Sequence, residues 1–145
     1  DVIGTVGVRE AIGPVALDMG VTGYHYFGEP DGTPSGDWTE YHVAASGKMV
    51  GVGLSGAVKY TPDGIFKTGE AWRFEAGASR QAYGPISAFA QLGVNVGPLD
   101  YRDYRAGLHA EFRKVTAEVY YSTTDGLDGF DAGGRIVAAI GVQIG

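Results

Sequence analysis

The sequence predicts an all-β fold, arranged as an antiparallel transmembrane β-barrel. The prediction depends first on an alternation of side chains with a period of two residues. From Val50 to Tyr60, one face carries mainly valine, leucine and tyrosine, and the other carries glycine, serine, alanine and lysine. Successive side chains of a strand point to opposite faces, so this stretch is a strand with one apolar face and one small, polar face. A series of such strands fits a barrel with lipid outside and water inside.

Length and composition limit the alternatives. The 145 residues are expected to form a single β-barrel domain, residues 1–145. The chain has no cysteine, which excludes a disulfide scaffold and thiolate metal sites. No apolar run approaches the roughly 20 residues of a membrane helix, whereas a tilted transmembrane strand needs only about 9–11. The net charge of −6 argues against a nucleic-acid partner.

About nine segments show the alternation, and none has the 3.6-residue period of an amphipathic helix. We expect strands at Val2–Arg9, Val15–Phe27, Trp38–Ser46, Val50–Tyr60, Ala71–Arg80, Ile86–Val96, Tyr101–Phe112, Val115–Tyr121 and Arg135–Ile144.

The connections between these segments alternate in length. Every second connection is rich in glycine, proline and aspartate, and most of these connections are longer than their neighbours. The tight connections are expected at Glu10 to Pro14, Gly47-Lys48, Gln81 to Pro85 and Arg113-Lys114. Outer-membrane barrels have short periplasmic turns and longer external loops, so this alternation predicts which end of the sheet faces outward.

The two faces of the strands carry different candidate residues. The polar face is predicted to line a pore with Glu40, His42, Lys59, Arg73, Glu75, Gln91, Arg105, His109, Glu111, Glu118 and Arg135. The apolar face carries aromatic residues at the strand ends nearest the long loops, where amphipathic rings favour the headgroup level of a membrane. This lipid-facing girdle is predicted to comprise Tyr41, Tyr60, Trp72, Phe74, Tyr104 and Tyr121.

A soluble barrel or sandwich is the alternative fold, and its apolar face would form the core. Two features disfavour it. A soluble core would not place its aromatic residues in one belt at one end. A soluble exterior would not be so rich in glycine, alanine and serine while carrying charges of both signs. Small residues on an interior wall instead leave room for charged neighbours to pair.

Several segments share a motif in which an aspartate is followed by an aromatic residue and, three residues after that residue, by a tyrosine. Asp37-Trp38-Thr39-Glu40-Tyr41 and Asp100-Tyr101-Arg102-Asp103-Tyr104 are the two clearest copies, and Glu70 to Ser79 is a looser one. With the alternating runs that follow them, these segments resemble the TorF-type porins of Gram-negative bacteria. The resemblance implies an outer-membrane barrel without catalytic residues.

Candidate sites for chemistry are few. The tight Arg113-Lys114 turn should place Phe112 opposite Val115 and His109 opposite Glu118 on the polar face. A histidine–carboxylate pair suits acid–base catalysis, but an ion pair on the wall is the favoured interpretation because no serine stands out as a third member. The three histidines lie on different strands, so we expect no metal site. We also expect no cofactor and no enzymatic activity.

The long loops are acidic, and an acidic rim would concentrate cations at a pore mouth. The run from Asp125 to Asp131 could bind Ca²⁺ through carboxylate and carbonyl oxygens. Its spacing does not match the EF-hand, and Asp-Gly is also common in ordinary turns, so both interpretations stay open at this point.

The predicted function is a porin-like barrel of the bacterial outer membrane that allows passive diffusion of small solutes or ions. A non-conducting structural barrel and, less favoured, a soluble ligand-binding β-barrel are the alternatives. The surrounding partner is outer-membrane lipid, and a homo-oligomer or membrane complex stays open. Bacterial barrels have an even number of strands. Because the count here is odd, we expect further N-terminal strands. Outer-membrane barrels usually end in an aromatic residue that follows alternate apolar positions, and Ala138, Ile140, Val142 and Ile144 fit this pattern. We therefore also expect a terminal aromatic residue just after Gly145.

Overall fold

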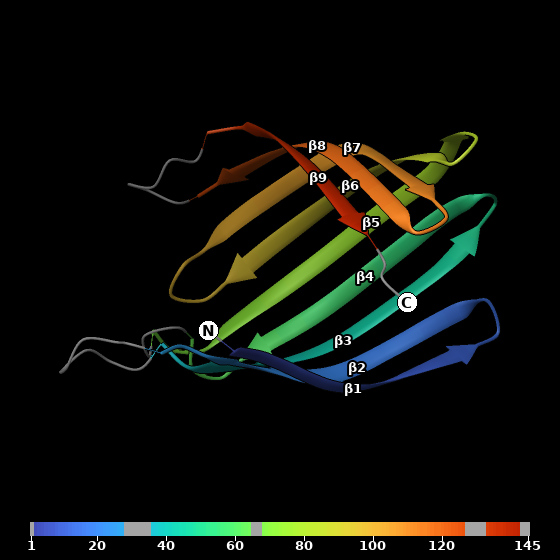
Figure 1. The fold of residues 1–145 in the computed structure, drawn as a ribbon. Coiled ribbons are helices and arrows are strands. Elements are labelled where there is room, and N and C mark those ends of the chain that lie inside the picture. Colours follow the sequence, from blue (N-terminus) through green and yellow to red (C-terminus); the bar gives the residue numbers. More distant parts are fainter. Residues whose placement is uncertain (1, 28–35, 65–67, 127–132, 143–145) are drawn as a thin grey trace.

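A single antiparallel sheet of nine strands makes up this protein, in a computed structural model that describes residues 2–27, 36–64, 68–126 and 133–142. The strands follow one another across the sheet in chain order (Figure 1). They are β1 (Val2–Ile12), β2 (Val15–His25), β3 (Trp38–Met49), β4 (Val52–Thr61), β5 (Ala71–Tyr83), β6 (Ile86–Val96), β7 (Tyr101–Phe112), β8 (Val115–Asp125) and β9 (Arg135–Val142). Every pair of neighbours is antiparallel, which confirms the predicted all-β, antiparallel class. Within the described ranges, the structure has no helix of the length and apolarity that crossing a membrane requires.

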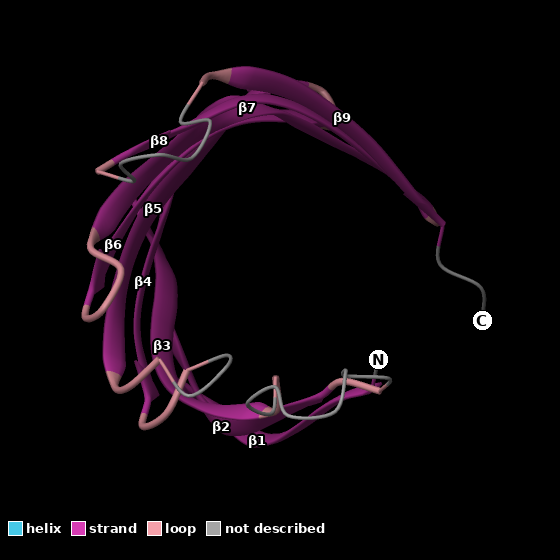
Figure 2. Cartoon of the chain, turned by 90° about the vertical axis from the view of Figure 1, so that its left-hand side faces the viewer, coloured by secondary structure: helices cyan, strands magenta, loops and turns pink. Residues whose placement is uncertain are grey.

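The sheet curls into a deep trough. Seen end-on, its strands follow an arc that leaves an opening between β9 and β1 (Figure 2). These two strands are the edges of the sheet, and no described backbone pairing joins them. The structure therefore shows a strongly curved sheet, and the expected closure into a barrel is not part of it.

Two-residue turns connect β1 to β2, β3 to β4, β5 to β6 and β7 to β8. In each of these hairpins, the last residue of one strand pairs with the first residue of the next, which leaves two residues in the turn. Each turn contains residues with positive φ, as the tight turns that match strand twist require. The residues concerned are Gly13 (φ 60°), Val50 (φ 50°), Gly51 (φ 75°), Gly84 (φ 52°) and Arg113 (φ 53°).

One of the four tight connections was predicted too early in the chain, and two others were predicted too long. Gly47 and Lys48, expected to be a turn, pair with Leu54 and Gly53 inside the ladder, and the turn lies at Val50-Gly51. Strands β1 and β5 likewise continue to Ile12 and Tyr83. The physical reason is that small and polar residues near the strand ends resemble turn residues in the sequence.

The two faces of the sheet differ in chemistry, and no described apolar side chain is buried. The apolar side chains form the convex face, where Leu54, Leu92 and Leu108 are 44%, 39% and 45% exposed. They therefore do not converge on a dry interior. The polar side chains lie on the concave face, where they surround the space inside the trough.

The first testable prediction concerns the β3–β4 turn. Val50 is 94% exposed and has a left-handed backbone that β-branched residues rarely adopt. Val50→Asn should raise the free energy of unfolding by roughly 1 kcal/mol, since asparagine tolerates this conformation and no packing is lost. Urea unfolding from lipid vesicles measures the change. Val50→Ile is the matched control and should be neutral, because it keeps both exposure and strain; an unchanged or lower stability of Val50→Asn would contradict the prediction.

Candidate functional site

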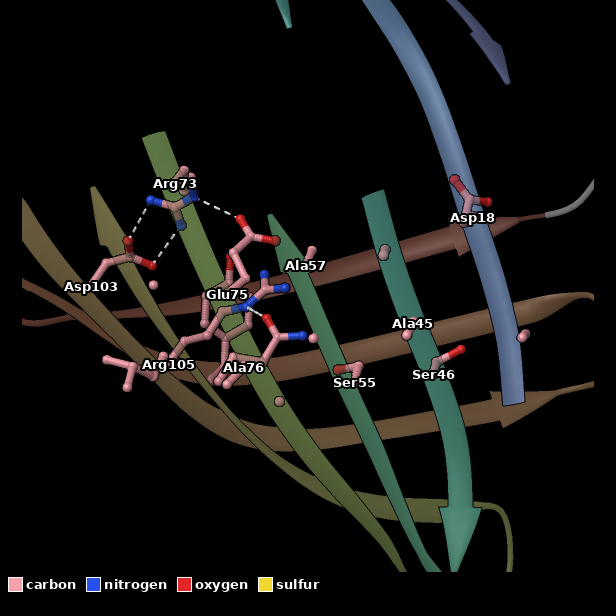
Figure 3. Close-up of a pocket in the computed structure, with 18 of the residues that line it drawn as sticks. Asp18, Ala45, Ser46, Ser55, Ala57, Arg73, Glu75, Ala76, Asp103 and Arg105 are labelled. Carbon is pink, nitrogen blue, oxygen red and sulfur yellow. Dashed lines mark hydrogen bonds and ion pairs between the residues drawn. The ribbon is translucent and has the colours of Figure 1, made fainter. Parts of the chain in front are cut away.

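The concave face is the candidate functional surface, and the strand register defines it. Side chains of directly paired residues point to the same face, so His42, Lys59 and Arg73, which pair in succession on β3, β4 and β5, share one face. A cavity of about 490 Å³ lies on that face and is lined from Arg9 on β1 to Tyr120 on β8, which is the concave side (Figure 3). The register places all of the predicted pore-lining residues on this face. Their pore-lining role stays a prediction.

A chain of ion pairs crosses the concave face on its loop side. We call it the charged belt and define it by Glu40, Lys59, Glu75, Arg73 and Asp103. Lys59 Nζ lies 3.9 Å from a Glu40 oxygen and 3.3 Å from Glu75 Oε1. Arg73 connects the next two members, with Nε 2.6 Å from Glu75 Oε1 and Nη1 2.8 Å from Asp103 Oδ2. The belt alternates in sign, so it neutralises most of its own charge.

A glycine makes the last contact of the belt possible. Strand β6 lies between Arg73 on β5 and Asp103 on β7, and it contributes Gly93 at this level. A Cβ atom at Gly93 would lie 2.5 Å from Arg73 Nη2 and 2.5 Å from Asp103 Oδ2. Asp103 lies within β7, whose bounds agree with the strand predicted at Tyr101–Phe112.

A second polar cluster centres on Arg105, one row of residues nearer the tight turns. Arg105 Nε donates a hydrogen bond to Gln91 Oε1. The guanidinium carbon lies 6.0 Å from the ring centre of Phe89 and 5.7 Å from that of Tyr120, which are cation–π distances. Gly107 on β7 lies between the two rings, because it pairs with both residues.

The three histidines do not form a common site. His42 Nε2 lies 2.9 Å from Asp18 Oδ1 on the concave face, and His25 Nδ1 lies 2.7 Å from Asp37 Oδ2 on the convex side of β2. The described residues contain no group of three or more histidine, cysteine, aspartate or glutamate residues able to hold a metal ion. Most of the candidate Ca²⁺ run lies outside the described residues, which end at Gly126 and resume at residue 133.

The predicted register at the β7–β8 turn is confirmed. Phe112 pairs with Val115 and His109 pairs with Glu118, whose Oε2 lies 3.5 Å from His109 Nδ1. The structure adds Ser87, which pairs directly with His109 from β6 and was missed in the sequence. Catalytic bases work at about 2.6–3.2 Å from their partners. Among the described contacts, His109 has only this longer ion pair, and the absence of a catalytic role stays a prediction.

The convex face carries the predicted aromatic girdle. All of its members lie on this face by register, and three of them form a row across neighbouring strands. The ring centres of Tyr41 and Tyr60 lie 6.5 Å apart, and those of Tyr60 and Trp72 lie 4.6 Å apart. The lipid contact of these rings stays a prediction.

On the convex face of the described strands, charged side chains occur only near the strand ends. Glu10 and Arg80 lie near the tight turns, and Arg102 and Asp125 lie near the loops. Between them, the apolar part of β7 runs from Tyr104 to Phe112 and extends about 27 Å at about 3.4 Å per residue. A tilt of about 40° reduces its height to about 21 Å, close to the apolar band of about 25 Å on membrane barrels.

Several aromatic residues of the concave face were missed in the sequence. Tyr24 and Trp38 stack with ring centres 3.9 Å apart, and Phe89 and Tyr120 contact each other at 6.2 Å. The two-residue period that placed their neighbours would have found them.

No protein-family model matches the chain, and comparison with curated proteins and with solved structures likewise found no match. The resemblance to TorF-type porins therefore stays a prediction. The function has to be argued from the geometry of the two faces.

The second prediction tests the close approach at Gly107. A Cβ atom there would lie 2.6 Å from Tyr120 Cα and would overlap the Val119 carbonyl oxygen, which belong to the neighbouring backbone. Gly107→Ala should lower the free energy of unfolding by about 2 kcal/mol or more, because strand β8 has to shift. Gly23→Ala is the matched control, since a Cβ there meets no atom within 4 Å, and it should change stability by less than about 0.5 kcal/mol. Equal effects of the two variants in urea unfolding would refute this account of Gly107.

Proposed function

We propose that this chain forms the wall of a porin-like β-barrel in the bacterial outer membrane, through which small solutes or ions diffuse passively. The observation that carries the proposal is the distribution of chemistry over the curved sheet. The convex face is apolar and exposed, and the concave face is polar and surrounds a cavity. A protein surrounded by water would arrange these faces the other way round.

The size of the exposed apolar surface supports a lipid environment. Large hydrophobic side chains are exposed on the convex face of every strand; Ile136 and Ile140, for example, are each 79% exposed. Apolar area in water carries a free-energy cost of about 25 cal/mol per Å². Soluble monomers rarely expose contiguous patches of more than a few hundred Å². Lipid tails remove this cost without any change in the fold.

The same observation counts against the soluble ligand-binding barrel. Such a barrel would bind its ligand against apolar side chains pointing inward. On this chain, the residues that line the concave cavity are mainly charged, hydroxyl, amide and small residues, among them Arg73, Glu75, Gln91, Arg105 and Ser122.

A non-conducting structural barrel is the second candidate, and the charged belt is the observation that favours it. Its ion pairs hold four long side chains across the concave face, where they occupy part of the lumen. Cavities of about 490 and 590 Å³ nevertheless lie on the concave face, and the second extends toward the tight turns. Conduction depends on whether the fully closed barrel keeps these spaces connected.

The third prediction compares neighbouring residues of β4. The chain has no cysteine, so single cysteines can carry nitroxide spin labels. In lipid vesicles, a label at Leu54→Cys on the convex face should be relaxed preferentially by oxygen, which partitions into lipid. A label at Ser55→Cys, which lines the concave cavity, should be relaxed by a water-soluble nickel chelate. The reverse order, or water accessibility at both positions, would refute the membrane assignment.

The fourth prediction concerns conduction. The full-length protein in a planar bilayer should produce discrete, long-lived current steps that grow with salt concentration, because the lumen is lined by polar side chains. The Ser55→Cys variant provides the control: a bulky water-soluble thiol reagent added to it should reduce the current, and the same reagent should leave the cysteine-free protein unaffected. If the correctly folded protein gives no current, the structural barrel is the better description.

A further inference from the structure

The concave face contains one row of side chains that carries hydrogen-bond donors and no carboxylate. Consecutive cross-strand pairs connect Ser46 to Ser55, Ser55 to Gly77, and Gly77 to Gln91. The row continues through Arg105, Ser122 and Arg135 on β7, β8 and β9. We call it the donor row and define it by Ser46, Ser55, Gln91, Arg105, Ser122 and Arg135. All of its members except Arg135 line the cavity of about 490 Å³.

The carboxylates that line the same cavity are already engaged by other groups. Asp18 contacts His42, Asp103 contacts Arg73, and Glu75 contacts both Arg73 and Lys59. No described carboxylate forms an ion pair with Arg105. Figure 3 shows the contrast, because dashed lines join Arg73 to the carboxylates of Asp103 and Glu75 on two sides. Arg105 thus brings a positive charge to the cavity wall that no described carboxylate neutralises.

The Arg105 guanidinium is held by three neighbours. Its Nε donates to Gln91 Oε1, and its central carbon lies over the rings of Phe89 and Tyr120. Two Nη groups are left without a described protein acceptor. A planar guanidinium with two such groups matches the two oxygens of a carboxylate or phosphate.

The neighbours of Arg105 add further hydrogen-bond donors to the row. Because Gln91 accepts from Arg105 through Oε1, its amide NH₂ is left as a donor. The missing side chain at Gly77 lets Ser55 and Gln91 approach each other across β5, since a Cβ there would lie 2.6 Å from Ser55 Oγ and 3.2 Å from Gln91 Cγ. Ser122 presents a hydroxyl directly opposite Arg105.

We propose that the donor row is a binding site for small oxyanions, the carboxylate or phosphate group of a solute, with Arg105 as its anchor. This inference names a solute class for the proposed pore and rests on that function only for the solute's route to the site. The acidic rim at the loops and the donor row inside would act on different steps of passage. The rim alters the ion concentration at the mouth of the pore, and the donor row binds oxyanions that have already entered.

The experiment titrates inorganic phosphate against chloride at constant ionic strength, because chloride is a single acceptor atom and cannot place a separate oxygen on each Nη group. Two readouts are followed on the full-length protein: the current through single channels, and the NMR signal of the Arg105 Nε–H in detergent micelles. Phosphate should reduce the current and shift the signal, both with half-saturation in the millimolar range. Chloride at the same ionic strength should do neither.

Three variants identify the residue responsible. Arg105→Gln should weaken phosphate binding about tenfold or more, since a charge-assisted hydrogen-bond pair is lost. Arg105→Lys keeps the charge and should still weaken binding several-fold, because an ammonium group cannot bind both oxygens in one plane. Arg102→Gln removes the same charge from the opposite face of the same strand and should leave binding unchanged.

The outcomes separate this inference from the proposed pore. Current that phosphate does not affect would overturn the oxyanion site and leave the pore intact. A phosphate-dependent NMR shift in a protein that passes no current would retain the site and overturn the pore. If Arg105→Gln binds phosphate as tightly as the wild type, Arg105 is not the anchor. The same conclusion follows if Arg102→Gln loses as much phosphate affinity as Arg105→Gln does. Wild-type phosphate affinity in Arg105→Lys would rule out recognition of two oxygens.

Discussion

Cross-strand register is the constraint on which both faces of this sheet depend. Side chains alternate between faces along every strand, so a slip of one residue would move Arg73 to the convex face and Trp72 to the concave face. Two-residue turns at Gly13-Pro14, Val50-Gly51 and the corresponding positions of the next two hairpins fix the register within each hairpin. The separation of charge from apolar surface is therefore a property of the turns as much as of the strands.

The sequence was informative wherever a contact is local. Alternation alone predicted all nine strands, and a tight turn made the pairing of His109 with Glu118 predictable. The pairing of Ser87 with His109 was not predictable, because β6 and β7 are joined through the longer connection at residues 97–100, which does not fix a register.

Glycines of the concave face explain how charged side chains can share a narrow wall. Gly93 leaves space for Arg73 to reach Asp103 across β6, and Gly107 leaves space for Phe89 and Tyr120 to approach each other across β7. In each case, the small residue lies on the strand between the two partners. The abundance of glycine, which costs strand stability in most sheets, is here the condition for contacts between second-neighbour strands.

The free edges of the sheet set a condition on any membrane arrangement. Because all neighbours in the nine-stranded order are antiparallel, β1 and β9 run in the same direction. Joining them directly would create a parallel pair in an otherwise antiparallel sheet. Unpaired backbone groups have no water to bind within the hydrocarbon region, and each costs several kcal/mol there. The opening seen in Figure 2 therefore requires a partner in lipid, and an odd number of additional strands is the arrangement that keeps every neighbour antiparallel and satisfies both edges.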